Sequence, residues 1–275
     1  MKLRFTKMHG IGNDFAVVDC RDRPLALSPA QIAQIGDRHT GIGFDQLLTI
    51  EPSRNPDCAF VYGIWNSDGT GAGQCGNGVR CVAAWLQRAG ALGVGATRLQ
   101  SPSGPVAVEL FDDGDVRVDM GVPRFAPVDI PLNLPAADPY RLRVGDALVE
   151  FGAVSMGNPH AVIEVDDIAV APLQSRGAAL STNVHFPQRC NVGFAQIVDR
   201  AQLRLCVWER GAGATLACGT GACAAVAVLR RRGKLDADVS VQLPGGTLRI
   251  QWVGEGASVW MRGPAQFVFE GEMDV

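Results

Sequence analysis

The sequence has no long apolar segment and no concentration of charge of one sign. No stretch approaches 18 uninterrupted apolar residues, which argues against a membrane span, and residues 1–10 carry charge but no apolar core of a signal peptide. The formal net charge is −3 and the longest basic run is Arg230–Arg232, so binding to nucleic acid has little support. We therefore expect a cytoplasmic protein that engages neither membranes nor nucleic acid.

Disulfides are also not expected, because a reducing compartment keeps the eight cysteines as thiols. The rest of the composition is that of an ordinary globular chain of 275 residues, 47% hydrophobic and 19% charged. This length is comfortable for two domains. The 33 glycines predict many tight turns or close backbone approaches.

Three landmarks recur in the same order in the two halves of the chain. Asn13 and Asn158 lie in similar seven-residue segments 145 positions apart, and Cys75 and Cys218 lie 143 positions apart in similar Cys-Gly-x-Gly loops. The third landmark is a polar residue nine positions before each cysteine, preceded by an apolar run: Asn66 and Glu209. This nearly constant offset indicates duplication, so we expect two similar domains that face each other across a cleft.

Hydrophobic periodicity and turn residues predict the elements of each half. In the first half we expect strands over 3–7, 15–19, 60–65, around 99, and over 106–110 and 116–120, with helices over 29–38 and from 76 to Gly90. In the second half we expect strands near 149–155, 161–165, 203–208, 239–243, 247–252 and 258–262, with a helix over 219–232. This last helix is apolar on nearly every side, which predicts a central position in its domain.

Each half places a cysteine at the start of a glycine-rich helix. The first turn of a helix has backbone N–H groups without intrahelical partners, and together with the helix dipole they favour negative charge. We therefore expect the pKa of Cys75 and of Cys218 to fall from about 8.5 toward neutrality. The same N–H groups can hold a carboxylate, because glycine lets a ligand approach the backbone closely.

This arrangement suggests proton transfer at a carbon next to a carboxylate. If the two loops face each other, one thiolate removes the α-proton and the opposite thiol returns one to the other face, which inverts the carbon. The helix starts would stabilise the charge that develops on the carboxylate. Such chemistry requires neither pyridoxal phosphate nor a metal.

The motifs that carry these residues resemble those of the diaminopimelate epimerase family, over essentially the whole chain. In the first half the resemblance rests on Lys7–Phe15, Gly41–Leu48, and Asn66–Gly69 leading into Gln74–Gly78. In the second half it rests on Gly157–His160, Cys190–Val192, and Trp208–Gly213 leading into Ala217–Gly221. The resemblance implies cofactor-independent interconversion of LL- and meso-2,6-diaminopimelate, in the biosynthesis of lysine and of peptidoglycan precursors.

The resemblance also implies a role for each matching residue. Cys75 and Cys218 would be the catalytic bases, with His160 and Glu209 as a supporting polar pair at the reacting centre. The backbone N–H groups that hold the reacting carboxylate would belong to Gly76, Asn77, Gly219 and Thr220. The distal amino acid would be gripped by Asn66, Asn158, Asn191 and Arg210, with Glu209 near its amine and the pocket completed by Asn13 and Gln46.

The implied fold is α/β, of the α+β type, with two pseudo-symmetric domains and the active site in the cleft between them. Each domain would be a curled, mostly antiparallel sheet around a central helix. Residues 1–119 would form the first domain, to which 264–275 returns, and residues 120–263 the second. The family usually forms homodimers, and Phe269 matches its aromatic dimer contact. The chain departs from common family residues at Ala161, Gly193 and Ala214, none of them assigned to substrate.

Several simpler interpretations compete with these assignments. A buried structural thiol is the usual fate of a free cysteine, and we expect mostly this for Cys20, Cys58, Cys81, Cys190, Cys206 and Cys223. A zinc site of Cys75, Cys81, Cys218 and Cys223 is conceivable, but its spacings fit zinc ribbons poorly. Asn13 and Asn158 also suit turns, and we expect them to serve both purposes. Glu209 and Arg210 could form a surface ion pair, although their place beside the second cysteine loop argues against it.

Two other functions stay open. A two-cysteine isomerase of another amino acid, such as a proline-type racemase, would have no use for a polar grip on a second zwitterionic end. A non-enzymatic amino-acid-binding or thiol redox protein would not exchange the α-proton of its ligand with solvent.

Overall fold

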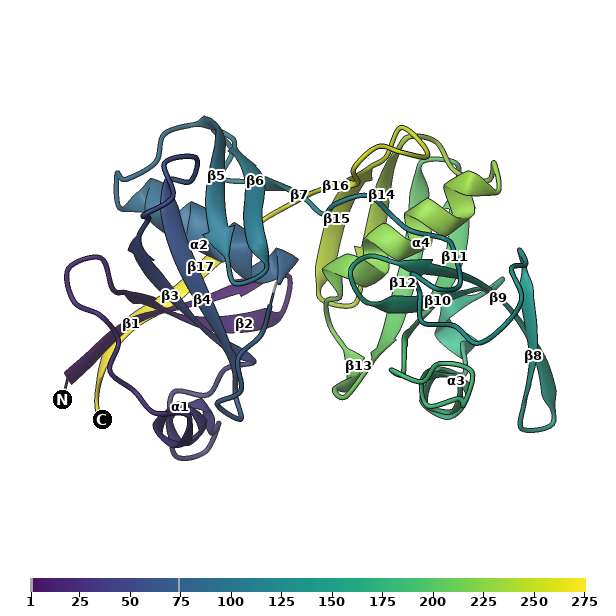
Figure 1. The fold of residues 1–275 in the computed structure, drawn as a ribbon, viewed down its shortest axis with the longest axis horizontal. Coiled ribbons are helices and arrows are strands. Elements are labelled where there is room, and N and C mark those ends of the chain that lie inside the picture. The colour runs from purple at the N-terminus through teal and green to yellow at the C-terminus, as the bar shows by residue number, and fades with distance from the viewer. Residues whose placement is uncertain (1, 74) are drawn as a thin grey trace. The chain divides into compact units, whose positions relative to one another are not determined.

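The computed structural model describes residues 2–73 and 75–275, so Gln74 of the first cysteine loop lies outside the described residues. The chain divides into two compact units (Figure 1). Unit 1 comprises the described residues of Met1–Asp119 together with Arg262–Val275, and unit 2 comprises Met120–Met261. Among the described residues, no helix combines the length and the apolar character needed to cross a membrane.

Unit 1 is a mixed sheet with two helices, α1 (Pro29–Gly36) and α2 (Gly76–Arg88). Its strands are β1 (Lys2–Gly10), β2 (Asn13–Asp19), β3 (Gln46–Pro52), β4 (Phe60–Asn66), β5 (Gly95–Ser101), β6 (Gly104–Leu110), β7 (Val116–Asp119) and β17 (Gln266–Asp274). The C-terminal strand β17 pairs antiparallel with the N-terminal strand β1, so the two ends of the chain meet in one unit.

Unit 2 contains the helices α3 (Ala178–Ser181) and α4 (Gly219–Arg231), preceded by a 3₁₀ turn over Ile168–Val170 and a π-helical turn over Leu173–Gly177. Its strands are β8 (Tyr140–Val144), β9 (Ala147–Ser155), β10 (Pro159–Glu164), β11 (Asn191–Asp199), β12 (Gln202–Glu209), β13 (Gly213–Thr215), β14 (Asp238–Leu243) and β15 (Gly246–Gln251). Strand β16 (Trp260–Gly263) contains the point in the chain where unit 2 gives way to unit 1.

The order of strand pairing is the same in the two units. In unit 1, β1–β2, β3–β4 and β5–β6 are antiparallel, whereas β2–β3 and β4–β5 are parallel. In unit 2, β9–β10, β11–β12 and β14–β15 are antiparallel, whereas β10–β11 and β12–β14 are parallel. Parallel neighbours need a crossover, and α2 and α4 supply it at corresponding places. The duplication expected from the sequence is therefore confirmed.

A central helix fills the inside of each curled sheet. Every residue of α4 from Gly221 to Leu229 is buried, and the helix packs against β9, β10, β11, β12 and β15 (Figure 1). In α2 the buried run extends from Gly76 to Ala84, and this helix packs against β1, β2, β3, β6 and β7. The prediction that the second helix is central is confirmed, and most of the first turn of each helix is buried as well, with Thr220 half-buried.

A second apolar layer lies on the other side of each sheet. In unit 1, Ile32 and Ile35 of α1 join a cluster with Phe44 and Leu47. Helix α1 begins where predicted, because Ser28 and Gln31 form a reciprocal cap ahead of Pro29. In unit 2 the corresponding layer includes Phe151 of β9 and the segment around Phe186. Each sheet is thus packed on both faces, and this packing holds in place the strand ends that carry the polar loops.

Some strands were absent from the sequence-based prediction. The segments that form β3 and β11 had been assigned only to motifs, because their polar ends, Gln46 and Asn191, interrupt the apolar pattern. The strand predicted over 60–65 is confirmed as β4, and its apolar run suggests a buried strand, but only Tyr62 and Ile64 are fully buried, while Trp65 is half-exposed. One face of this strand therefore lies outside the core.

The contact between Gly152 of β9 and α4 tests how tightly the central helix is held. A Cβ at Gly152 would approach Cγ1 of Val228 to 2.2 Å, which requires a shift of the packed helix. Gly152→Ala should lower the free energy of unfolding by about 1–3 kcal/mol in urea titrations. Gly93→Ala is the control, because nothing lies within 4 Å of a Cβ there.

Combining Gly152→Ala with Val228→Ala should relieve part of the loss, since the second change removes the colliding methyl group. Equal losses from the two glycine variants would contradict this view of the packing.

Candidate active site

Cys75 caps the N-terminus of α2 with its side chain. Its Sγ accepts a hydrogen bond from the backbone N–H of Gly78 at 3.4 Å. A Cβ at position 78 would meet Leu48 at 3.2 Å and the Cys75 Cβ at 3.4 Å, so glycine lets the sulfur fold over the first turn of the helix. This explains the second glycine of the first Cys-Gly-x-Gly loop.

Cys218 holds the corresponding position at the N-terminus of α4, but its surroundings differ. The residue is only 3% exposed, whereas Cys75 is half-buried. Its Sγ lies 3.7 Å from the hydroxyl oxygen of Thr220. A Cβ at Gly221 would come within 3.1 Å of this sulfur and 3.0 Å of Val207, so glycine is again required at the third position after the cysteine.

The expectation of a lowered thiol pKa is wrong for Cys218. Burial raises its pKa well above the ordinary value, and the negative charge of Glu209 raises it further. Hydrogen bonds with Thr220 and with the N–H of Gly221 act in the opposite direction but do not outweigh burial. A sulfur removed from water loses more stabilisation as a thiolate than the helix start returns. At neutral pH Cys218 is therefore a thiol.

The first turns of α2 and α4 present backbone N–H groups beside each cysteine. Gly76, Asn77 and Gly219 are buried and Thr220 is half-buried. The first N–H groups of a helix have no acceptor within it, and the helix dipole adds partial positive charge. Each half-site can thus hold one anionic oxygen next to a sulfur atom.

In unit 1, three of the predicted polar residues lie near one another on β2, β3 and β4. Oδ1 of Asn13 lies 3.7 Å from Sγ of Cys75 and accepts from Nδ2 of Asn77 at 3.3 Å. Gln46 pairs with Asn66 across the sheet, and its Nε2 donates to Oδ1 of Asn66 at 3.0 Å. The loop after β4 holds the other side of this amide, since Nδ2 of Asn66 donates to Thr70.

Two acceptor atoms of this half-site are buried and have no hydrogen-bond partner among the described residues: Oε1 of Gln46 and Oδ1 of Asn77. Buried polar atoms are rarely left in this state, because the missing hydrogen bond costs about 1–3 kcal/mol. These oxygens are suited to a ligand that donates hydrogen bonds, such as an ammonium group.

In unit 2, Asn158, His160 and Asn191 form a connected group. Nε2 of His160 lies 2.9 Å from Oδ1 of Asn158 and 3.4 Å from Nδ2 of Asn191. Oδ1 of Asn191 accepts from the backbone N–H of Arg210 at 2.8 Å, which ties β11 to the end of β12. The guanidinium of Arg210 is exposed and donates to the carbonyl of Gln188 at 3.0 Å.

Burial keeps His160 neutral. It lowers the pKa of this imidazole from 6.5 to about 3, and the positive charge of Arg210 contributes in the same direction. The side chain is 1% exposed, so a proton on the ring would be a charge without water. Through Nε2 a neutral ring can either donate to Asn158 or accept from Asn191, according to its tautomer, and it does not repel a cationic ligand.

Glu209 lies beside the second cysteine loop, at the end of β12. Its Oε1 accepts from the hydroxyl of Thr215 at 2.5 Å, and its backbone pairs with Gly213 of β13. Its effect on the pKa of Cys218 shows that carboxylate and sulfur are within electrostatic reach. Thr70 and Thr215, which hold Asn66 and Glu209, are not predicted from the sequence. Thr70 lies in the loop after β4 and Thr215 ends the short strand β13, and neither segment has a distinguishing signal.

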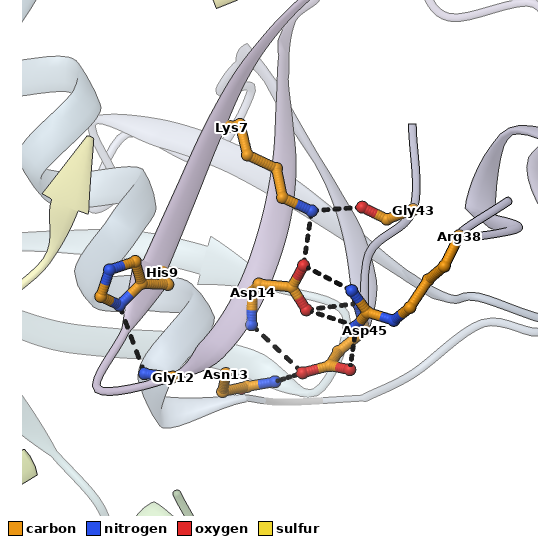
Figure 2. A network of polar contacts seen from close by, with 8 residues as sticks. All are labelled: Lys7, His9, Gly12, Asn13, Asp14, Arg38, Gly43 and Asp45. Carbon is orange, nitrogen blue, oxygen red and sulfur yellow. Dashed lines mark hydrogen bonds and ion pairs between the residues drawn. The ribbon is translucent and has the colours of Figure 1, made fainter. Parts of the chain in front are cut away.

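A charged network around Asn13 was also missed (Figure 2). Its members are Lys7, Asp14, Arg38 and Asp45, and Asn13 donates to Asp45 through its side-chain nitrogen at 2.8 Å. The signal was present in the sequence, because charged residues stand inside two glycine-rich motifs. The network could not be predicted, because it forms only when the loop after α1 brings Arg38 to Asp14 at the start of β2.

The remaining sequence assignments have structural explanations. Of the six cysteines interpreted as core, five are buried and Cys206 is half-buried. Ala161 is buried in the second apolar layer of unit 2, and Ala214 is exposed. A Cβ at Gly193 would meet Leu205 at 3.2 Å. The described residues contain no group of three or more His, Cys, Asp or Glu placed to hold a metal ion.

The fold is that of several solved racemases, epimerases and PhzF-type proteins. A hydroxyproline epimerase from Agrobacterium vitis matches with a TM-score of 0.72 at 15% identity, over 98% of this chain and 92% of that one. A phenazine biosynthesis protein of the PhzF family from Bacillus anthracis matches with a TM-score of 0.73 at 15% identity, over the whole of both chains. At this identity the likeness establishes the fold alone.

Comparison of the amino-acid sequence identifies the family more specifically than comparison of the fold. The diaminopimelate epimerase family model matches residues 5–126 and 152–268. The diaminopimelate epimerase of Xanthomonas axonopodis pv. citri is 56% identical over 98% of this chain and 96% of its own length. That of Chromobacterium violaceum is 50% identical over the full length of both. The chain belongs to the diaminopimelate epimerase family.

The buried His160 predicts a specific loss of stability in acid. Because its pKa is lowered in the folded state, the unfolded chain takes up a proton below about pH 6.5 while the folded protein does not until about pH 3. Its contribution to stability is thus present above pH 6.5 and lost as pH falls. Between pH 7 and pH 5 this residue should cost about 2 kcal/mol of unfolding free energy.

Urea titrations at the two pH values test this, with His160→Gln expected to remove about that share of the change. His39→Gln, at an exposed histidine, is the control and should behave like the parent. An identical pH dependence in the parent and the His160 variant would contradict a neutral buried imidazole.

Proposed function

We propose that this protein epimerises LL-2,6-diaminopimelate to the meso form and back, using Cys75 and Cys218 as the two acid–base groups. The observation that carries the proposal is the equivalent placement of the two cysteines, each as the N-terminal cap of a buried central helix. Membership of the diaminopimelate epimerase family supports the substrate and the reaction.

Inversion at one carbon needs a base on one face and an acid on the other. In the LL-to-meso direction, a thiolate at Cys75 would remove the α-proton and the thiol of Cys218 would donate one to the opposite face. The high pKa of Cys218 supports its starting as the acid. In the reverse direction the roles exchange, with each sulfur again in the protonation state that the forward reaction left.

The reacting carboxylate would lie against the first turns of the two helices. The N–H groups of Gly76, Asn77, Gly219 and Thr220 would stabilise the second negative charge that builds on it as the α-proton leaves. Glu209 would bind the amine at the reacting centre, with neutral His160 beside it. This cluster would let the carbanion form without an electron-withdrawing cofactor.

The distal amino acid would be held by Asn66, Asn158, Asn191 and Arg210, with Asn13 and Gln46 closing the pocket. The unpaired acceptor of Gln46 supports this, because a zwitterionic end brings an ammonium donor. A proline-type racemase would not need such a grip, and a simple binding or redox protein would not exchange the α-proton of its ligand with solvent. Cytoplasmic location is part of the same proposal.

We also infer a homodimer that uses strand β17. Phe269 is 51% exposed and Val268 is 55% exposed, which places two large apolar side chains side by side in the chain on the surface of unit 1. Phe269 meets Phe5 of β1 edge-on, with ring centroids 5.9 Å apart, so its ring is held in a defined orientation. Fixed exposed aromatic rings are typical of subunit interfaces.

Cys75→Ala and Cys218→Ala should each abolish interconversion, because neither sulfur can serve both faces of the carbon. We expect kcat to fall by at least about 10²-fold in each variant. The measurement is proton NMR of LL-diaminopimelate in D₂O with reduced protein, which follows both α-proton exchange and formation of the meso form.

Cys81→Ala and Cys223→Ala are the matched controls, since these cysteines are buried within the same two helices and are not assigned to the reaction. Activity on proline but not on diaminopimelate would indicate the racemase alternative. Binding of diaminopimelate without exchange in the parent protein would indicate a binding protein.

Arg210→Lys should lower kcat/KM for diaminopimelate, because it should weaken transition-state binding by about 1.5–3 kcal/mol, the scale of a charged hydrogen bond. A planar guanidinium can hold a carboxylate with two parallel hydrogen bonds, which an ammonium group cannot reproduce. Arg204→Lys is the control, at an exposed arginine of β12, the strand that immediately precedes Arg210. If the two variants have the same kcat/KM, Arg210 does not bind substrate.

A further inference from the structure

The side-chain amide of Asn13 joins the first cysteine to a carboxylate. Its Nδ2 donates to Oδ2 of Asp45 at 2.8 Å, which leaves Oδ1 to face Sγ of Cys75 at 3.7 Å and Nδ2 of Asn77 at 3.3 Å. The oxygen of Asn13 can therefore accept the S–H hydrogen of Cys75. The reversed amide would instead point an N–H donor at the sulfur.

Asp45 decides between these two orientations. Reversing the amide of Asn13 would place its oxygen against the carboxylate of Asp45, and a carboxylate can only accept hydrogen bonds. Asn77 could adapt by rotating its own amide, whose Oδ1 has no hydrogen-bond partner among the described residues. The carboxylate has no such alternative, so the orientation depends on Asp45.

Asp45 is itself held by a network of charges that Figure 2 shows. Arg38 donates to Oδ1 of Asp45 at 2.8 Å and to Oδ1 of Asp14 at 2.6 Å. The backbone N–H of Asp14 donates to Asp45 at 3.1 Å, and the N–H of Asp45 donates back to the Asp14 carboxylate at 3.1 Å. Lys7 completes the network by donating to Asp14 and to the carbonyl of Gly43.

Asp14, at the centre of this network, is held as a carboxylate. Burial alone would raise the pKa of Asp14, but hydrogen bonds from Arg38 and Lys7 and their positive charges outweigh it and bring the pKa to about 2. Two carboxylates and two cations balance one another. Asp45, the anchor of Asn13, is thus held in place by hydrogen bonds from Arg38 and from the backbone of Asp14.

We propose that Asp45 is a positioning residue for the reaction, which fixes the amide of Asn13 so that its oxygen faces Cys75. This inference rests on the proposed function for its relevance to catalysis. An acceptor at the sulfur stabilises the thiol, whereas the N–H of Gly78 on the other side stabilises the thiolate. Cys75 can thus be held in either protonation state, as a group that alternately gives and takes a proton requires.

The second half-site is built differently. Asn158, which corresponds to Asn13 in the repeat, directs its Oδ1 to His160 and not to a sulfur. Cys218 is instead adjacent to Thr220, whose hydroxyl can both donate and accept. Asp45 thus distinguishes two cysteines that otherwise occupy equivalent positions.

The test is the pH profile of alkylation of Cys75 by iodoacetamide, which reacts with the thiolate. The full-length reduced protein is used without substrate, and peptide mass spectrometry resolves Cys75 from the other cysteines. Tyr62 of β4 and Cys81 of α2 are titratable groups that respond to the charge of Cys75, although burial is the main reason that the pKa of each is raised. Both are retained in every variant.

Asp45→Asn should move the midpoint of the profile down by about one pH unit, because the amide of Asn13 can then reverse and donate to the sulfur. Asn13→Ala should move it down by less, since an acceptor is lost and no donor is gained. In the Asn13→Ala background, Asp45→Asn should add no shift. Asp37→Asn is the matched control; it removes one negative charge from the same loop, where Asp37 binds His39 and Thr40, and should leave the midpoint unchanged.

Three results would overturn the proposal: no shift in Asp45→Asn, the same shift with and without Asn13, which would reflect lost charge alone, or an upward shift in Asn13→Ala. If Asp45→Asn does not fold by circular dichroism, the sign of the Asn13→Ala shift decides by itself. Because no substrate is present, these results do not depend on epimerase activity. Failure of the parent to exchange the α-proton of diaminopimelate would reject the proposed function separately.

Discussion

The structure depends on burying most of a helix in each unit, including most of its first turn. In α4 the apolar side chains from Ala222 to Leu229 fill the inside of a curled sheet, and α2 does the same in the other unit. A helix start inside a protein leaves N–H groups that must be satisfied by something other than water. Here a cysteine is the N-cap residue of each helix, and glycines leave room beside the first turn. The N–H groups at each buried helix start can therefore bind an anion next to a thiol.

The two half-sites show how one motif acquires different chemistry from its neighbours. Both sulfurs lie over a helix N-terminus, which by itself favours a thiolate. At Cys218 burial and the nearby charge of Glu209 outweigh that effect, and the pKa rises. At Cys75, which is half-buried, an amide oxygen and a backbone N–H contact the same sulfur. The duplication supplied equivalent positions, and the surrounding loops made them unequal.

One polar group in each unit has a pKa that lies well below neutral pH. Asp14 is held ionised by Arg38 and Lys7, and His160 is held neutral by burial. These groups can orient hydrogen bonds without responding to a proton that moves nearby. Protonation states fixed in this way suit the transfer of a proton between two sulfur atoms that we propose.

The sequence by itself determined those helices and turns for which capping residues, hydrophobic pattern and turn residues indicate the same structure. The capped start of α1, the apolar run of α4 and the turn glycines fixed their places, and the recurring landmarks indicated the duplication. The residues of the two cysteine loops could be singled out for the same reason, because Cys-Gly-x-Gly has few purely structural uses. Strands β3 and β11 were not foreseen, since polar site residues at their first positions hide the alternation.

Only the tertiary structure decided the electrostatics of these residues. Whether a thiol at a helix start gains or loses acidity depends on how much water reaches it, and burial is set by segments distant in sequence. The same holds for Asn13, whose amide orientation depends on Asp45 and, through it, on an arginine that follows α1. Patterns in a sequence report local conformation and burial of a face; the direction of a hydrogen bond is a property of all the groups that meet in space.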